Sequence, residues 1–200
     1  MKLYTSLTSP YGRKCRIAAH VAGVADRVMV TEVDYKADAY SAVNPLKKVP
    51  ALARDDGSVL TDSPVICAYV ASLGDTAKVI PTDSEARWKS LALEALADGI
   101  TDAGVLIFLE HKRDADKQSA GWLALQTAKI NAGLDAINAQ AADYGDRTDI
   151  GVLAIAACVA WLEFRSIVPG IRTGRDQLSA WLDAINAKDF MVATAPPEGA

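Results

Sequence analysis

The stretch that decides the fold is Thr8-Ser9-Pro10-Tyr11-Gly12-Arg13-Lys14-Cys15-Arg16, which directly follows a short apolar segment at residues 2–5. Ser9 is a good helix N-cap and Pro10 suits the first helical position, so the stretch predicts a strand followed by a helix. The unpaired amides and the positive dipole end at the start of a helix favour a thiolate or a carboxylate. The stretch therefore predicts an anion site at Ser9 or, as the plainer alternative, a hydroxyl that only caps the helix.

A second segment, Lys48-Val49-Pro50-Ala51, places a proline where a predicted strand begins. Proline cannot donate a ladder hydrogen bond, so it belongs at an edge or a bend of the sheet. A cis Val49-Pro50 bond would leave the backbone of Val49 free to pair with an extended peptide ligand. The sequence does not decide between cis and trans.

A third segment, Asp62-Ser63-Pro64, repeats the pattern of a hydroxyl before a proline at a helix start. We expect Ser63 to be the N-cap and Pro64 the first helical residue. With Asp62 beside the cap, a ligand that bears both an amino group and a carboxylate would find both of its charges matched. The alternative is a well-capped helix with Asp62 in solvent.

Taken in order, these segments resemble the glutathione S-transferase family, and the resemblance extends over nearly the whole chain. The Ser-Pro-Tyr motif stands where glutaredoxins carry Cys-Pro-Tyr-Cys, so Ser9 takes the place of the nucleophilic cysteine and Gly12 that of the resolving one. The chain also resembles small bacterial transferase-like proteins with a Ser-Pro-Phe/Tyr-x-Arg-Lys motif. The resemblance implies an α/β thioredoxin-like N-terminal domain followed by an all-α helical-bundle C-terminal domain.

Local signals along the chain agree with that architecture. Strands are predicted at residues 2–5, 28–33, 51–53 and 59–60, and helices at 10–22 and 63–73. Strand signals stop at 74–82, and helices are predicted at 83–112, 118–141, 149–167 and 176–186, before a disordered tail at 195–200. We expect a glutathione-binding domain at 1–76 and, at 83–200, a helical domain that contributes the electrophile pocket.

The resemblance implies a mechanism in which the protein activates the thiol of glutathione. Ser9 would donate a hydrogen bond to the thiolate, with Tyr11 or Tyr4 as alternative donors, because some transferase classes use a tyrosine. The resemblance assigns the parts of glutathione to the remaining motif residues: Val49, beside Pro50, to the cysteinyl backbone; Lys48 or Lys47 to the glycine carboxylate; and Asp62 with Ser63 to the γ-glutamyl group. Tyr11 and residues near 106–112 would line the pocket for a hydrophobic electrophile.

Three acidic residues, Glu94, Asp98 and Asp102, follow one another at helical spacing. Such a line is either a solvated face or a site for a cation, because like charges at this spacing repel. In several dimeric transferases an acidic residue reaches the γ-glutamyl amine of glutathione on a neighbouring subunit. The resemblance therefore implies a homodimer and assigns this role to Asp98.

Composition excludes several classes of function. A net charge of −4 with scattered basic residues argues against nucleic acid and anionic membranes as partners. The longest uncharged apolar run, 150–162, is too short to cross a bilayer. The three cysteines lie far apart in apolar contexts, which predicts burial, and the two histidines are too few and too distant for an ordinary metal site. Residue 1 leads directly into a strand, so we expect a cytoplasmic protein without a signal segment.

These inferences favour a glutathione S-transferase, acting in detoxification, with glutathione as co-substrate and no metal. Two alternatives stay open. One is a glutathione-dependent peroxidase or reductase, in which the lack of a cysteine at position 9 weakens the disulfide route. The other is a non-catalytic protein that uses the same fold for binding or dimerisation.

Overall fold

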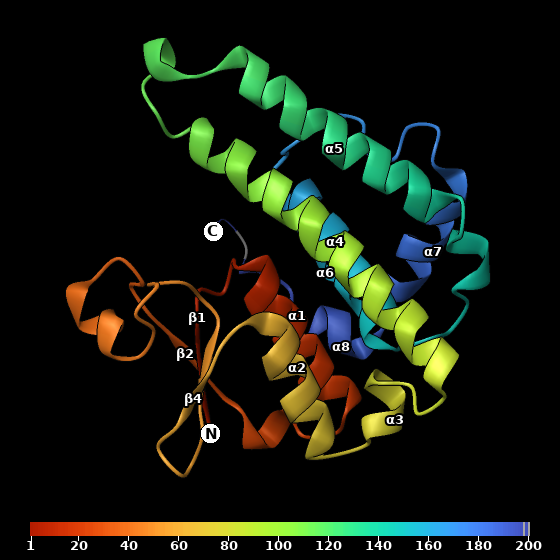
Figure 1. Cartoon of the computed structure of the whole chain (residues 1–200). Helices are drawn as coiled ribbons and strands as arrows, with labels where there is room; N and C mark the ends of the chain where they lie inside the picture. Colours follow the sequence, from red (N-terminus) through yellow and green to blue (C-terminus); the bar gives the residue numbers. More distant parts are fainter. Residues whose placement is uncertain (198, 200) are drawn as a thin grey trace.

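The N-terminal part of the chain forms a small mixed sheet, as the computed structural model, which describes residues 1–197 and 199, shows (Figure 1). Its four strands run in the order β2-β1-β3-β4. Their bounds are β1 Lys2–Thr5, β2 Met29–Glu32, β3 Ala51–Ala53 and β4 Val59–Leu60. β1 pairs in parallel with β2 and antiparallel with β3, which places Leu3 opposite both Val30 and Leu52. Parallel pairing requires a crossover between β1 and β2, and α1, Pro10–Val21, supplies it.

Two helices pack together beside this sheet (Figure 1). α1 follows β1, and α2, Ser63–Ser72, follows the β3–β4 hairpin. Both helices begin with the Ser-Pro pattern, because a proline at the first turn removes an amide that would otherwise lack a partner. The starts of α1 and α2 are therefore two helix N-termini of the N-terminal domain, each with a Ser-Pro pair.

The rest of the chain is helical. Its elements are α3 Thr76–Val79, α4 Ser84–Glu110, α5 Ala120–Asn138, α6 Ile150–Phe164, α7 Asp176–Asn186 and α8 Asp189–Val192, with short 3₁₀ turns between some of them. The long helices α4 and α5 pack against each other and extend past the sheet domain at one end (Figure 1). α6 is nearly all apolar and lies buried at the centre, as its sequence predicts.

Close backbone contact joins α4 to the start of α6. Asp149 caps α6 by accepting from the Gly151 amide at 3.2 Å, and the Ser90 hydroxyl of α4 donates to the same carboxylate at 2.5 Å. A Cβ on Gly151 would lie 2.5 Å from the Ser90 carbonyl oxygen, so only glycine permits this approach.

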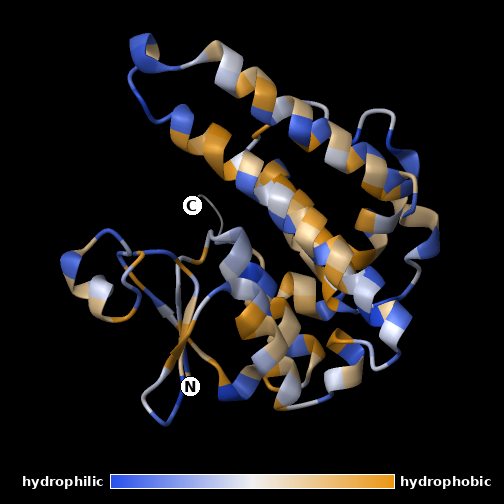
Figure 2. Cartoon of the chain, in the orientation of Figure 1, coloured by the Kyte–Doolittle hydropathy of each residue, from blue (hydrophilic) through white to orange (hydrophobic). Residues whose placement is uncertain are grey.

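Two hydrophobic clusters form the interior, one centred on the sheet and one in the helical part. Each cluster includes a residue from the other part of the chain. Ile17 of α1 belongs to the helical cluster, and Ile150 of α6 belongs to the sheet cluster. Figure 2 shows apolar residues concentrated along α4 and α6, whereas the first turns of α1 are largely hydrophilic. Helix α1 is therefore a structural link between the two halves.

The fold class predicted from the sequence is confirmed, whereas the limits 1–76 and 83–200 stay a prediction. The predicted strand at 28–33 is shorter, and the predicted linker at 74–82 contains the short helix α3. Helix α8 was not predicted, because four residues carry too little periodicity to be recognised. Of the tail predicted to be disordered, positions 198 and 200 lie outside the described residues, and residues 195–197 form no helix or strand.

Candidate functional site

Ser9 lies at the N-terminus of α1, just beyond the end of β1. Its Oγ accepts a hydrogen bond from the Gly12 amide at 3.1 Å, so the predicted N-cap is confirmed. Because the oxygen accepts this bond, the hydroxyl proton stays available for donation to another group. A Cβ on Gly12 would come within 2.0 Å of the Thr5 hydroxyl, so glycine lets the first turn lie against the end of the strand.

Tyr11 reaches from the first turn of α1 to α4 of the helical domain. Its hydroxyl donates a hydrogen bond to the carboxylate of Asp102. Burial and this neighbouring carboxylate raise the pKa of Tyr11 well above its usual range, so the phenol stays protonated. The proton of Tyr11 therefore points to Asp102, which leaves Ser9 as the hydroxyl of this turn with a proton to donate elsewhere.

The loop before β3 carries a cis Val49–Pro50 peptide bond. Asn44, which is buried, fixes the shape of this loop from within: its side chain accepts from the Leu46 amide at 3.0 Å and donates to the Lys48 carbonyl at 2.8 Å. The Tyr40 hydroxyl donates to the same carbonyl at 3.1 Å. Neither residue was singled out in the sequence, although Asn-Pro is a recognised turn signal.

The two lysines of this loop have different surroundings. Lys47 Nζ lies 2.5 Å from an Asp38 carboxylate oxygen. Lys48 is exposed, and no acidic side chain of the described residues forms an ion pair with it. Of the two alternatives for a carboxylate ligand, Lys48 is the one whose charge is not already paired.

At the start of α2 the structure corrects the sequence interpretation. Asp62, not Ser63, is the N-cap, and its carboxylate accepts from the Ser63 amide. The Ser63 side chain is 1% exposed, and its Oγ has no hydrogen-bond partner among the described residues. A buried hydroxyl without a partner is costly, so a ligand group that satisfies it would be bound favourably.

Lys14 is a central residue that the sequence analysis missed. It is 1% exposed, and its Nζ lies 3.0 Å from Glu94 Oε1 and 2.6 Å from Asp98 Oδ2, both on α4. Burial disfavours its charge, but the anionic groups around it, these two carboxylates included, outweigh burial and hold its pKa above the usual range. Burial also raises the pKa of both carboxyl groups, while Lys14 opposes that rise.

This network corrects the interpretation of the acidic line on α4. Glu94 is buried and Asp98 is half-buried, so the line is a solvated face only at Asp102, and the cation that relieves the repulsion between Glu94 and Asp98 comes from the same chain. Lys14 lies on the inward stripe of α1 that also carries Ile17 and Ala18, both fully buried. That helical spacing is the signal by which Lys14 could have been recognised as a buried charge in need of acidic partners.

The arginines beside Lys14 hold the C-terminal end of the chain. Arg13 donates to the Met191 carbonyl at 3.1 Å, and Arg16 donates to the Thr194 and Ala193 carbonyls, each at 3.3 Å. The Met191 carbonyl belongs to α8 and those of Ala193 and Thr194 follow it, so all three lie at a helix C-terminus, where positive charge is stabilising. The basic cluster of the motif is therefore directed into the protein and not toward the start of α1.

The three cysteines are buried, as predicted. The Sγ atoms of Cys15 on α1 and Cys67 on α2 lie 3.7 Å apart. Burial raises the pKa of Cys158 to about 12 and raises that of Cys15 as well, so these thiols stay protonated near neutral pH. Within the described chain, no group of three or more His, Cys, Asp or Glu side chains is placed to hold a metal ion. The described helices also include none with the length and apolar character to cross a membrane.

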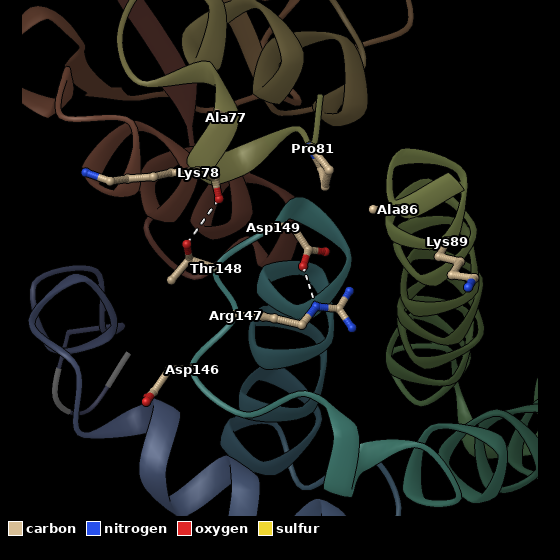
Figure 3. Close-up of a pocket in the computed structure, with 9 residues that line it drawn as sticks. All are labelled: Ala77, Lys78, Pro81, Ala86, Lys89, Asp146, Arg147, Thr148 and Asp149. Carbon is tan, nitrogen blue, oxygen red and sulfur yellow. Dashed lines mark hydrogen bonds and ion pairs between the residues drawn. The ribbon is translucent and has the colours of Figure 1, made fainter. Parts of the chain in front are cut away.

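A pocket of about 370 Å³ lies away from all these residues, where the linker meets α4 and the loop before α6 (Figure 3). Asp149 holds the Arg147 Nε at 2.7 Å, and the rest of the guanidinium points toward α4 (Figure 3). The pocket is therefore distinct from the expected electrophile site beside Tyr11.

Sequence and structure comparisons give a consistent result. The family described as "Glutathione S-transferase, N-terminal domain" matches residues 3–77. The uncharacterized GST-like protein YibF of Escherichia coli is 34% identical and covers 99% of this chain and 100% of its own. Maleylpyruvate isomerase of Ralstonia is 30% identical over 70% of this chain and 68% of its own.

Among solved structures, a glutathione transferase family member of Pseudomonas fluorescens Pf-5 with bound glutathione has a TM-score of 0.92. It is 36% identical, and the match covers 98% of each chain.

Proposed function

The chain belongs to the glutathione S-transferase family, and we propose that it binds glutathione, stabilises its thiolate with the Ser9 hydroxyl and directs that thiolate at a hydrophobic electrophile. The observation that carries the proposal is the geometry of Ser9. Its oxygen accepts from the Gly12 amide, which leaves the hydroxyl proton to point away from the helix start.

The energies suffice for this role. Lowering the pKa of a thiol by two units requires about 2.7 kcal/mol of preferential stabilisation of the thiolate. One hydrogen bond to a charged group contributes roughly 1.5 to 3 kcal/mol. The N-terminal dipole of α1 adds up to about 1 kcal/mol. No general base is needed, because the thiol proton is released to water.

Glutathione fits the remaining residues by charge. The buried Ser63 hydroxyl and the start of α2 suit the γ-glutamyl carboxylate, and Asp62 suits its ammonium. The backbone of Val49, beside Pro50, suits the cysteinyl unit as an added strand. Lys48, which is not paired to an acid, suits the glycine carboxylate.

We assign Asp98 first to the network that fixes α1 against α4 through Lys14. Its side chain keeps 21% of its surface exposed, so it retains an edge that a neighbouring ligand can reach. The contact of Asp98 with glutathione on a second subunit stays a prediction, as does the homodimer itself.

Val65 of α2 and Trp88 of α4, 49% and 64% exposed, are the apolar side chains we expect a second copy to cover. Light scattering measures whether the protein is a homodimer in solution. A cytoplasmic location also stays a prediction.

The reaction we propose is a displacement or an addition at an electrophilic carbon. For an aryl chloride, the thiolate sulfur forms the new bond to carbon, and the chloride ion leaves with the bonding electron pair. The protein contributes thiolate stabilisation and positioning of the two reactants. Leu106 and Leu109, near the C-terminal end of α4, are the exposed apolar side chains we assign to the second substrate.

An isomerase is the second candidate, because one of the similar proteins is a maleylpyruvate isomerase. Maleylpyruvate is a dicarboxylic acid, and its binding would need cationic side chains beside Ser9. Asp102 accepts the hydrogen bond of Tyr11 and so places a negative charge, not a positive one, in this region. We therefore rank conjugation above isomerisation.

The proposal is tested by calorimetric titration with glutathione, followed by measurement of its thiol pKa in the complex from the ultraviolet absorbance of the thiolate. We expect binding and a thiol pKa lowered by about two units. Binding with an unchanged thiol pKa would favour the non-catalytic alternative. No heat, and no displacement by S-alkyl derivatives, would exclude the proposed function.

A further inference from the structure

We propose that Asp102 sets the charge of the second substrate: the site accepts apolar groups without negative charge and discriminates against anionic ones. The inference rests on the proposed function, because it concerns the group attached to the glutathione sulfur. It starts from the contact between the Tyr11 hydroxyl and the Asp102 carboxylate. Tyr11 is in the same helical turn as Ser9, so Asp102 lies about one tyrosine side chain from the start of α1.

Asp102 is followed by two apolar residues on the same side of α4. Leu106 and Leu109 follow it by four and seven residues, so all three side chains share one side of the helix. The two leucines are 38% and 50% exposed. We call Asp102, Leu106 and Leu109 the α4 face. An electrophile lying on it meets a carboxylate near the sulfur and aliphatic surface beyond.

Among the described residues, the Asp102 carboxylate forms no ion pair with a basic side chain. Lys14 is the cation that contacts α4 nearby, and it is engaged by Glu94 and Asp98. Asp102 receives a neutral phenol as its donor, because the pKa of Tyr11 is raised. A neutral donor satisfies a lone pair but leaves the charge of the carboxylate in place.

Other basic side chains of this region have contacts with groups other than Asp102, among them Arg165, which lies 5.4 Å from the centre of the Phe108 ring. Arg13 and Arg16 donate to carbonyls at the C-terminal end of α8 and directly after it. Lys112 lies 4.2 Å from the centre of the Phe108 ring, and Arg113 pairs with Glu110 at 3.4 Å. An anionic substrate would therefore approach Asp102 without a compensating cation from these residues. Two unit charges about 7 Å apart at an effective dielectric constant of about 20 to 40 repel strongly enough to change affinity by roughly tenfold or more.

The test compares two glutathione derivatives of nearly equal size, S-propylglutathione and its S-(propanoic acid) counterpart, by calorimetry. We expect the parent protein to bind the propyl derivative roughly tenfold more tightly. Asp102→Asn keeps an acceptor for Tyr11 and removes the charge, so we expect this ratio to fall severalfold, through tighter binding of the acid. The matched control is Glu85→Gln, an exposed charge on the same helix about 25 Å away, which leaves the ratio unchanged.

Ionic strength provides a measurement that needs no variant. Raising the salt concentration screens the repulsion, so the ratio of the affinities for the two derivatives moves toward one in the parent protein. A ratio near one in the parent, or a ratio that neither Asp102→Asn nor salt alters, overturns the inference and leaves the proposed function standing. If neither derivative nor glutathione binds, the proposed function fails and this inference fails with it.

Discussion

Helices α1 and α2 begin with the same Ser-Pro pair but use the serine differently. Ser9 is itself the N-cap, half-buried, with its oxygen on the Gly12 amide. Ser63 lies one position later, because Asp62 is the cap, and its hydroxyl is buried without a partner among the described residues. The first arrangement offers a proton to an anion in front of the helix, and the second offers an unsatisfied hydroxyl.

The helices also differ in how they are held. α1 carries Lys14, Arg13 and Arg16, all bound to parts of the helical domain. α2 has its largest contacts with α1 and belongs to the sheet cluster. The serine that we assign to thiol chemistry thus lies on the helix fixed by both domains, and the serine that we assign to ligand binding lies on the other. This comparison predicts different consequences for changes in the two helices.

The largest effect is expected from Lys14→Met, which removes the link between α1 and α4. Glu94 would remain buried, and Asp98 half-buried, without their cation, so we expect the free energy of unfolding to fall by about 3 to 5 kcal/mol. Chemical denaturation measures this loss.

Two further variants serve as controls for Lys14→Met. Adding Glu94→Gln and Asp98→Asn to it should restore most of the stability, because no buried charge is then left unpaired. Lys89→Met, which breaks an exposed pair with Glu85, should cost less than about 1 kcal/mol. A similar loss in both single variants would show that the buried network has no special role.

Ser9→Ala is expected to lower the rate of conjugation by about tenfold or more at saturating glutathione, with little change in glutathione affinity. The lost hydrogen bond to the thiolate is worth roughly 1.5 to 3 kcal/mol. Initial rates with a chlorinated nitrobenzene measure the effect.

The variant also loses a helix cap, so stability requires a control. Ser119→Ala removes the equivalent cap of α5, where the Trp122 amide donates to the Ser119 hydroxyl at 3.3 Å. It should lose similar stability and keep its activity. Equal conjugation rates in Ser9→Ala and the parent would remove Ser9 from the mechanism.

Ser63→Ala should show the opposite pattern from Ser9→Ala. Glutathione affinity is expected to fall about 5- to 20-fold, because a buried hydrogen bond to the γ-glutamyl carboxylate is lost. The free energy of unfolding should not fall, because the hydroxyl has no partner to lose among the described residues. Calorimetry and denaturation give the two values. The control is Ser72→Ala at the far end of α2, where the hydroxyl bonds the Tyr69 carbonyl at 2.6 Å and no effect on affinity is expected.

The smallest effect is expected at high pH, because the Lys14 charge is lost only as the pH approaches its raised pKa. The folded-state pKa of Lys14 is raised, so its stabilisation is complete below the ordinary lysine value of about 10.4 and is lost as pH rises beyond it. The free energy of unfolding of the parent should therefore decline more steeply above that pH than that of Lys14→Met. Lys89→Met should follow the parent. Parallel slopes in all three proteins would contradict the raised pKa.

Much of the fold was predictable from local signals. The strands at 2–5, 51–53 and 59–60 and the helix at 176–186 were predicted with their observed bounds, because turns, caps and apolar spacing act over a few residues. The cap at Ser9 was predicted for the same reason. At α2 the local pattern was ambiguous, because Asp62 and Ser63 are both good caps, and the prediction chose the wrong one.

The sequence by itself determined the start of α1, the loop that ends at Pro50 and the fold class, since each depends on neighbouring residues. Only the tertiary structure decided which hydroxyl is buried, where Tyr11 directs its proton and which cation meets the acidic line of α4. Lys14 lies 80 and 84 positions from its two carboxylates, and Tyr11 lies 91 from Asp102. Contacts over such separations depend on how α1 packs between the domains, because it is packing that brings distant side chains within the few ångströms at which charges and hydrogen bonds act.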